Sequence, residues 1–199
     1  MNKDDFRGKA GIRILPGEYY GTNGNEVITT LLGSCVACCL YDPVAGVSGM
    51  NHFMLSNGRY ARDLPLCISE AGRYGIHAME LLINRLFELG AEKRRLRAKV
   101  FGGASIMAKD QSSGNFFCVG DVNCKFIREF LANERIPVLA EDLGGATGRV
   151  IHFDTGDQSV MVRRMQKRVS IVLAKRDQDR WREDISLHEQ SKGEVEIWD

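Results

Sequence analysis

Residues Thr29–Leu55 read TTLLGSCVACCLYDPVAGVSGMNHFML, and this stretch decides how the chain folds. It contains two apolar runs, about Val27–Tyr41 and Val47–Leu55, and the first run is interrupted by Gly33-Ser34. The segment DPVAG at 42–46 carries the aspartate, proline and glycine that mark a turn. We therefore predict two strands joined by a short loop, as an antiparallel hairpin.

The same stretch contains a candidate nucleophile and a candidate base. Cys35 follows the Gly-Ser break on the first strand and His52 lies late on the second, so a returning hairpin brings them near each other. A histidine beside a cysteine can take the thiol proton and stabilise the reactive thiolate. The break itself lets the backbone turn, so amides supported by Gly33 and Ser34 can face a reacting oxygen, as in an oxyanion hole.

A catalytic histidine needs a third group that fixes its ring and tautomer. Thr29 is one candidate, because its hydroxyl can accept a hydrogen bond from a ring nitrogen. Asn51 is an alternative, but alternation along a strand points it to the face opposite His52. A plainer interpretation stays open: a cysteine in an apolar strand is usually inert core, and an Asn-His pair on a strand is usually structural.

Cys35 and Cys38 also form a C-x-x-C pattern, which could indicate a zinc site or a redox pair. Residues three apart in an extended strand point to opposite faces, so these two thiols cannot share a site without a turn. Cys38 and Cys39 could serve as oxidation partners of Cys35, but we expect them to fill the core.

Working outward, helical periodicity predicts one helix over Ser69–Leu89 and a second over Val122–Asn133, with Asp121 as its N-cap. Shorter apolar runs predict further strands at Ala10–Leu15, Glu18–Gly21, Ala98–Phe101, Ile136–Asp142, Arg149–Phe153, Ser159–Val162 and Val169–Leu173. Strands and helices do not alternate strictly. This order predicts an α+β fold, an α/β sandwich of layered mixed sheets with helices packed on one face.

Length and composition are those of a single globular domain of 199 residues. We expect a disordered N-terminus at 1–8, a catalytic domain at 9–174 and a charged tail at 175–199. A net charge of +1 excludes a global attraction to nucleic acid or an anionic membrane. The charged first residues do not form a secretory signal, and no apolar run is long enough to span a membrane, so we expect a cytoplasmic protein.

Five parts of the chain form a set of motifs: LLGSCVACCLYDPVAGVSGMNHFML, RYGIHAMELLINRLFELGA, AKVFGGASIM, the pattern around Gly120, Asn123 and Phe126, and EDLGGATGRVIHFDTGD. Together these motifs resemble the CheD family, the chemoreceptor glutamine deamidases. The resemblance covers about Ile12–Val162. The chain departs from the compact family pattern in its charged residues after about Lys175 and in Cys38-Cys39 beside the nucleophile.

The resemblance implies that Cys35, His52 and Thr29 are catalytic. It implies a hydrolase that converts glutamine side chains of methyl-accepting chemotaxis receptors to glutamate, in some members with methyl-ester hydrolysis as well. No metal or organic cofactor is implied, and the fold would be similar to the catalytic domain of cytotoxic necrotizing factor toxins. A chemotaxis phosphatase of the CheC type is an implied partner; nucleic acid and membrane insertion are not.

Two other functions stay open: a non-catalytic or dual-role regulator that binds the phosphatase, and a thiol redox protein that uses Cys35 and Cys38. For the deamidase, a glutamine on a helical receptor requires a shallow, open pocket. We expect the loop Asn57–Pro65 and the bend at Gly102-Gly103 to border it.

Overall fold

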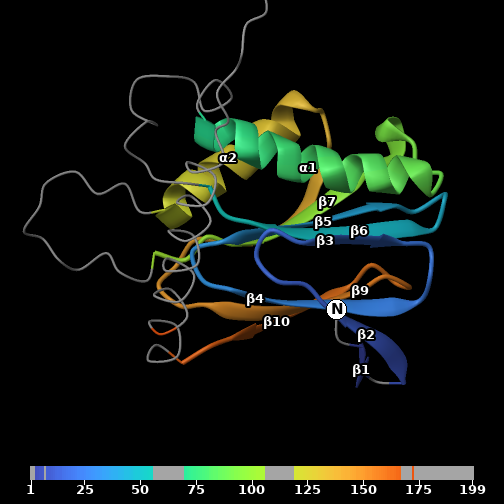
Figure 1. The fold of residues 1–199 in the computed structure, drawn as a ribbon, viewed down its shortest axis with the longest axis horizontal. Coiled ribbons are helices and arrows are strands. Elements are labelled where there is room, and N and C mark those ends of the chain that lie inside the picture. Colours follow the sequence, from blue (N-terminus) through green and yellow to red (C-terminus); the bar gives the residue numbers. More distant parts are fainter. Residues whose placement is uncertain (1–2, 7, 56–69, 106–118, 167–171, 173–199) are drawn as a thin grey trace, which may run out of the picture.

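The computed structural model describes residues 3–6, 8–55, 70–105, 119–166 and 172, and in them two five-stranded mixed sheets lie face to face (Figure 1). The first, called here the β4 sheet, has the order β1-β2-β4-β9-β10. Its strands are β1 (Lys3–Phe6), β2 (Lys9–Arg13), β4 (Glu26–Leu32), β9 (Arg149–Asp154) and β10 (Val160–Arg164). In it, β2 and β4 are parallel and the other neighbours are antiparallel.

The second, called the β5 sheet, has the order β3-β6-β5-β7-β8. Its strands are β3 (Tyr19–Thr22), β5 (Val36–Asp42), β6 (Val47–Phe53), β7 (Arg97–Gly102) and β8 (Val138–Leu143). Here β7 and β8 are parallel and the other neighbours are antiparallel.

Helices α1 (Glu70–Glu88) and α2 (Val119–Asn133) pack on one face of the β5 sheet, and the β4 sheet covers the other face (Figure 1). A 3₁₀ turn at Lys93–Arg95 leads into β7. Among the described residues, no helix is both long and apolar enough to cross a membrane. The molecule therefore has three layers: helices, β5 sheet, β4 sheet.

β5 lies between two hydrophobic cores, because both faces of its sheet are covered. Val36, Cys38 and Leu40 point to the helices, whereas Ala37 and Cys39 point to the β4 sheet. This explains why the strand sequence VACCLYD is apolar almost without interruption, as in strands buried on both faces.

The predicted α+β class and the helices on one face are confirmed. The antiparallel hairpin is confirmed as β5 and β6, which pair from Asp42↔Val47 to Val36↔Phe53. The expectation that Val27–Tyr41 is one interrupted strand is wrong. It forms β4 and β5, which belong to different sheets, and the Gly33-Ser34 break is the point where the chain crosses between them.

Other boundaries also differ from the predictions. Lys3–Phe6 pairs with β2 as strand β1, so the expected disorder of 1–8 is wrong for these four residues. α2 begins at Val119, so Asp121 lies in its first turn, where its carboxylate accepts a hydrogen bond from the Ser105 hydroxyl, and is not the N-cap. α1 and the other strands match the predictions within a few residues. The proposed strand 169–173 and the tail 175–199 lie outside the described residues, apart from residue 172.

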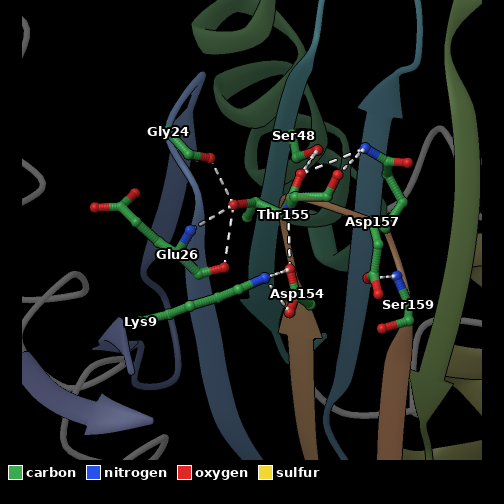
Figure 2. Close-up of polar contacts among 10 residues, drawn as sticks. Lys9, Gly24, Glu26, Ser48, Asp154, Thr155, Asp157 and Ser159 are labelled. Carbon is green, nitrogen blue, oxygen red and sulfur yellow. Dashed lines mark hydrogen bonds and ion pairs between the residues drawn. The ribbon is translucent and has the colours of Figure 1, made fainter. Parts of the chain in front are cut away.

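A polar cluster at the β9–β10 turn ties the two sheets together at the end where β4 begins (Figure 2). The buried Thr155 hydroxyl donates to Gly24 O at 2.7 Å and accepts from Glu26 N at 2.9 Å. The Ser48 hydroxyl, from the β5 sheet, donates to Thr155 O at 3.4 Å. Lys9 pairs with Asp154 at 2.6 Å.

Asp42 closes the β5–β6 turn with a carboxylate that is 0% exposed. It accepts hydrogen bonds from the backbone N–H groups of Val44, Ala45 and Glu92 and from Arg95 Nε at 2.9 Å. Burial alone would raise the pKa of this carboxyl, but these hydrogen bonds outweigh burial and hold the pKa below its ordinary value.

Because that pKa is lower in the folded state than in the unfolded chain, Asp42 contributes stability above the unfolded pKa of about 3.9, and this contribution is lost as the pH falls through the folded pKa. We predict that Asp42→Asn lowers the free energy of unfolding at pH 7 by about 3 kcal/mol, since it removes the buried carboxylate of this ion pair and leaves Arg95 with Glu92 as its charge partner. Urea unfolding at pH 7, 5 and 3 checks this. The difference in free energy of unfolding between wild type and variant must be smaller at pH 3 than at pH 7. A difference that stays constant contradicts the lowered pKa of Asp42.

Candidate active site

The crossing from the β4 sheet to the β5 sheet is held by hydrogen bonds to each of its three carbonyl groups. The bonds run from Ala104 N to Gly33 O (2.9 Å), from Asn123 Nδ2 to Ser34 O (2.8 Å) and from Gly103 N to Cys35 O (2.7 Å). All three donors come from the end of β7 or from α2. The backbone at the candidate nucleophile is therefore fixed from the helix side.

These bonds also orient the amide groups of the crossing. The described residues contain no cis peptide bond, and a trans peptide places its N–H opposite its C=O. With the Gly33 and Ser34 carbonyls directed at Ala104 and Asn123, the N–H groups of Ser34 and Cys35 point the other way. That orientation is what an oxyanion hole at this loop requires.

Glycines let the β7 end and α2 approach the crossing closely. Gly102 and Gly103 both have positive φ (113° and 69°), and a Cβ on Gly102 would overlap the Cys35 carbonyl oxygen. A Cβ on Gly103 would overlap the Cys124 sulfur. The bend thus lies against the Cys35 backbone, whereas its predicted place at the border of a substrate pocket stays a prediction. The other expected border, Asn57–Pro65, lies outside the described residues.

His52 and Thr30 meet between the two sheets. The Thr30 hydroxyl lies 2.8 Å from His52 Nδ1 and also donates to Ile14 O at 2.8 Å. A threonine hydroxyl has one hydrogen, so Thr30 accepts from His52 Nδ1–H. The neutral ring is therefore protonated on Nδ1, and the Nε2 lone pair is its basic site.

The structure corrects the expectation that Thr29 orients His52. Thr29 lies on the outer face of the β4 sheet, and its hydroxyl is 2.9 Å from Nδ1 of His152, its cross-strand neighbour on β9. The reason is alternation along β4: Ile28, Thr30 and Leu32 are buried toward the β5 sheet, which turns Thr29 outward. Adjacent threonines thus contact different histidines.

Cys35 and His52 face the same inter-sheet core. His52 is directly opposite Ala37 on β5, and Cys35 comes two residues before Ala37 and belongs to the same core. That makes the two side chains diagonal neighbours across the strand pair. Cys35 is 0% and His52 1% exposed, in contrast to the shallow, open pocket that the sequence led us to expect.

Asn51 points toward the helices, as predicted. Its Oδ1 accepts from Cys38 N at 3.1 Å and its Nδ2 donates to Ala78 O at 3.1 Å. The sequence reasoning missed two residues of the site, Thr30 and Asn123. The alternation of β4 could have favoured Thr30, but only once the crossing to a second sheet was known. Asn123 was named only within the motif around Gly120, Asn123 and Phe126, with no role assigned to it.

Comparison with known proteins gives a consistent picture. Residues 65–164 match the family described as CheD chemotactic sensory transduction. A relative from Geobacter sulfurreducens, "Probable chemoreceptor glutamine deamidase CheD 1", is 56% identical over 198 residues, which is 100% of this chain and 98% of the relative. The chain belongs to the CheD family. The Shewanella oneidensis protein "Probable chemoreceptor glutamine deamidase CheD 2" is 48% identical over 161 residues, covering 80% of this chain and 79% of that protein.

Among solved structures, the hypothetical protein YfiH of Bacillus licheniformis matches with a TM-score of 0.38 and 15% identity, over 62% of this chain and 49% of that one. This similarity is too low to bear on the site.

Three other cysteines of this CheD-family chain are poor candidates for the nucleophile. Cys38, Cys39 and Cys124 are buried free thiols. Burial raises the pKa of each above its ordinary value. Cys35 and Cys38 lie in different cores, on opposite sides of the β5 sheet, as alternation predicted. In the described part of the chain, no three His, Cys, Asp or Glu side chains are grouped to hold a metal ion.

The close approach at Gly103 can be tested against a matched glycine. Gly46 has nearly the same φ (66°), but a Cβ there meets nothing within 4 Å. We predict that Gly46→Ala lowers the free energy of unfolding by about 1 kcal/mol from backbone strain alone. Gly103→Ala should cost at least about 2 kcal/mol more, because the new methyl group displaces Cys124. Urea unfolding of both variants measures the difference, and equal losses would contradict the crowding.

Proposed function

We propose that this protein deamidates specific glutamine side chains of methyl-accepting chemotaxis receptors, forming glutamate and releasing ammonia. The relatives named chemoreceptor glutamine deamidases, at 56% and 48% identity, support this activity. The observation that carries the residue assignment is the shared face: Cys35, His52 and Thr30 all point into the space between the sheets.

In the first step, Nε2 of His52 takes the proton of the Cys35 thiol, and the thiolate attacks the carboxamide carbon of the receptor glutamine. The hydrogen bond from Nδ1–H to Thr30 supports this direction of transfer. It keeps Nδ1 protonated, so the incoming proton goes to Nε2, and it is retained when the ring becomes an imidazolium.

The carbonyl oxygen of the glutamine gains negative charge as the carbon becomes tetrahedral. The N–H groups of Ser34 and Cys35 are our proposed donors to it, with Gly33 permitting the turn. Their support is the orientation of the crossing, whose carbonyls are held on the opposite side. Each well-placed donor of this kind contributes roughly 3–4 kcal/mol to the transition state in other hydrolases.

In the second step, the His52 imidazolium gives its proton to the departing nitrogen, and ammonia leaves with the C–N electron pair. Water, deprotonated by the neutral ring, then attacks the thioester carbon. The C–S bond breaks, Cys35 recovers its proton and the product is glutamate. The same chemistry accepts a glutamyl methyl ester, with methanol as the leaving group.

The substrates we propose are the receptor segments that face the cytoplasm, and we place the protein there. Because Cys35 is wholly buried, receptor binding has to open the site. Ser34 and Met54 beside it are only half-buried, and the Ser34 hydroxyl contacts the Met54 sulfur at 3.9 Å. We also propose a CheC-type phosphatase as a second binding partner, as the family resemblance implies.

The decisive test is mass spectrometry of a receptor cytoplasmic fragment incubated with the protein. We predict a gain of about one dalton per modified glutamine, the mass of amide-to-acid conversion. Cys35→Ala should abolish the gain, whereas Cys39→Ala, a thiol on the same face of β5, should retain it. A receptor left unchanged by wild type, together with retained binding of the phosphatase, would favour the regulatory function instead.

The two adjacent threonines offer a second test. We predict that Thr30→Val lowers kcat roughly 10- to 100-fold, because the His52 ring loses the acceptor that fixes its tautomer. Thr29→Val, the matched substitution on the outer face, should change kcat less than about threefold. Initial deamidation rates at saturating receptor measure both. If Thr29→Val lowers kcat more than Thr30→Val does, Thr29 is the residue that orients His52.

A further inference from the structure

Asn123 occupies an unusual place at the open end of the β5–β6 ladder. Its side chain is 0% exposed and lies on the face of α2 that packs on the β5 sheet. Oδ1 accepts from Leu55 N at 2.8 Å, and Nδ2 donates to Ser34 O at 2.8 Å. One carboxamide therefore joins the nucleophile loop to the end of the strand that carries His52.

The register shows what this carboxamide replaces. The last ladder pair is Val36↔Phe53, so two residues further along each strand Ser34 is opposite Leu55. In a continued antiparallel ladder, positions two apart from a pair repeat its hydrogen-bonding pattern. Asn123 thus presents a donor and an acceptor to the two backbone groups that face each other there. A carboxamide is suited to this because it imitates a peptide group.

We propose that Asn123 is a positioning residue for the Cys35–His52 pair. By inserting between Ser34 and Leu55, it stops the ladder after Val36↔Phe53 and holds the loop apart from the His52 strand by a fixed distance. Cys35 follows Ser34 directly, and His52 is three residues before Leu55. Gly103 and Ala104 hold the loop from the β7 side, and this buried amide is the contact that sets the loop against the His52 strand.

This role rests on the proposed function, but it is testable without the receptor. The reactivity of the Cys35 thiol depends on its distance from the His52 ring, and loss of the Asn123 bridge changes that distance. The rate of alkylation of Cys35 by iodoacetamide, resolved from the other cysteines by peptide mass spectrometry, gives a pH profile. How often the buried site opens multiplies the alkylation rate by the same factor at every pH. The midpoint of the profile instead measures the pKa of the Cys35 thiol beside the imidazole.

We expect Asn123→Ala to move that midpoint upward by about one pH unit, since the ring no longer stabilises the thiolate at the native distance. In the receptor assay, kcat should fall roughly 10- to 100-fold with KM changed less than threefold. The matched control is Asn51→Ala. It removes another buried carboxamide that bridges β5 to a helix, but on the helix-facing side, so it should lower stability and leave the midpoint in place.

A second variant covers the case in which Asn123→Ala fails to fold. Asn123→Asp keeps the shape, but an ionised carboxylate cannot donate to Ser34 O, whereas a protonated one can. Its alkylation rate relative to wild type should approach one in acid and fall as the carboxyl ionises. A native midpoint in Asn123→Ala, or a rate ratio for Asn123→Asp that is independent of pH, overturns the proposal. If the wild-type protein does not deamidate the receptor, the proposed function is overturned. The positioning role of Asn123 is still tested, because the alkylation profile does not use the receptor.

Discussion

The structure depends on the crossing at residues 33–35, where one continuous stretch of chain leaves the β4 sheet and enters the β5 sheet. Each carbonyl of the crossing is bonded to the β7 end or to α2. A single such bond adds only about 1 kcal/mol to stability, but a buried carbonyl without a partner costs about 1–3 kcal/mol. The crossing therefore keeps its path mainly because another path would leave buried carbonyl groups without hydrogen-bond partners. Gly102 and Gly103 are required because a Cβ on Gly102 would overlap the Cys35 carbonyl oxygen and a Cβ on Gly103 would overlap the Cys124 sulfur.

The crossing determines which side chains can reach one another. Residues on β4 alternate between the inter-sheet space and the outer face, so the position of the crossing decides that Thr30 faces inward with His52 and Thr29 outward with His152. A shift of one residue would exchange the two threonines. The orientation of the site is therefore a property of sheet register rather than of local sequence, since both threonines have the same chemistry and neighbouring positions.

The dependence on sheet register explains which features could be predicted from the sequence and which could not. The hairpin, both helices and the pairing of Cys35 with His52 on one face follow from local patterns, because hydrophobic periodicity and turn residues act over a few positions. The orienting threonine does not follow, because a Gly-Ser break has the same appearance whether a strand bends or changes sheets. Asn123 was equally hidden: its partners, Ser34 and Leu55, lie far from it in sequence, and an amide on an apolar helix face gives no indication of what it binds.

The difference between Cys35, our proposed nucleophile, and Cys39 does not lie in burial. Both face the inter-sheet core, and both are wholly buried. Cys39 is paired across the ladder with Met50, and burial raises its pKa well above the ordinary value. By register both cysteines are diagonal to His52, one on either side of Ala37, so the strand pairing alone does not separate them. In a low-dielectric interior the attraction between a thiolate and an imidazolium is strong, but taking both charges out of water is costly, so such a pair needs further hydrogen-bond donors beside it. Only Cys35 lies at the crossing, where the N–H groups of Ser34 and Cys35 are directed away from the bonded carbonyls, and this backbone distinguishes the proposed nucleophile from Cys39.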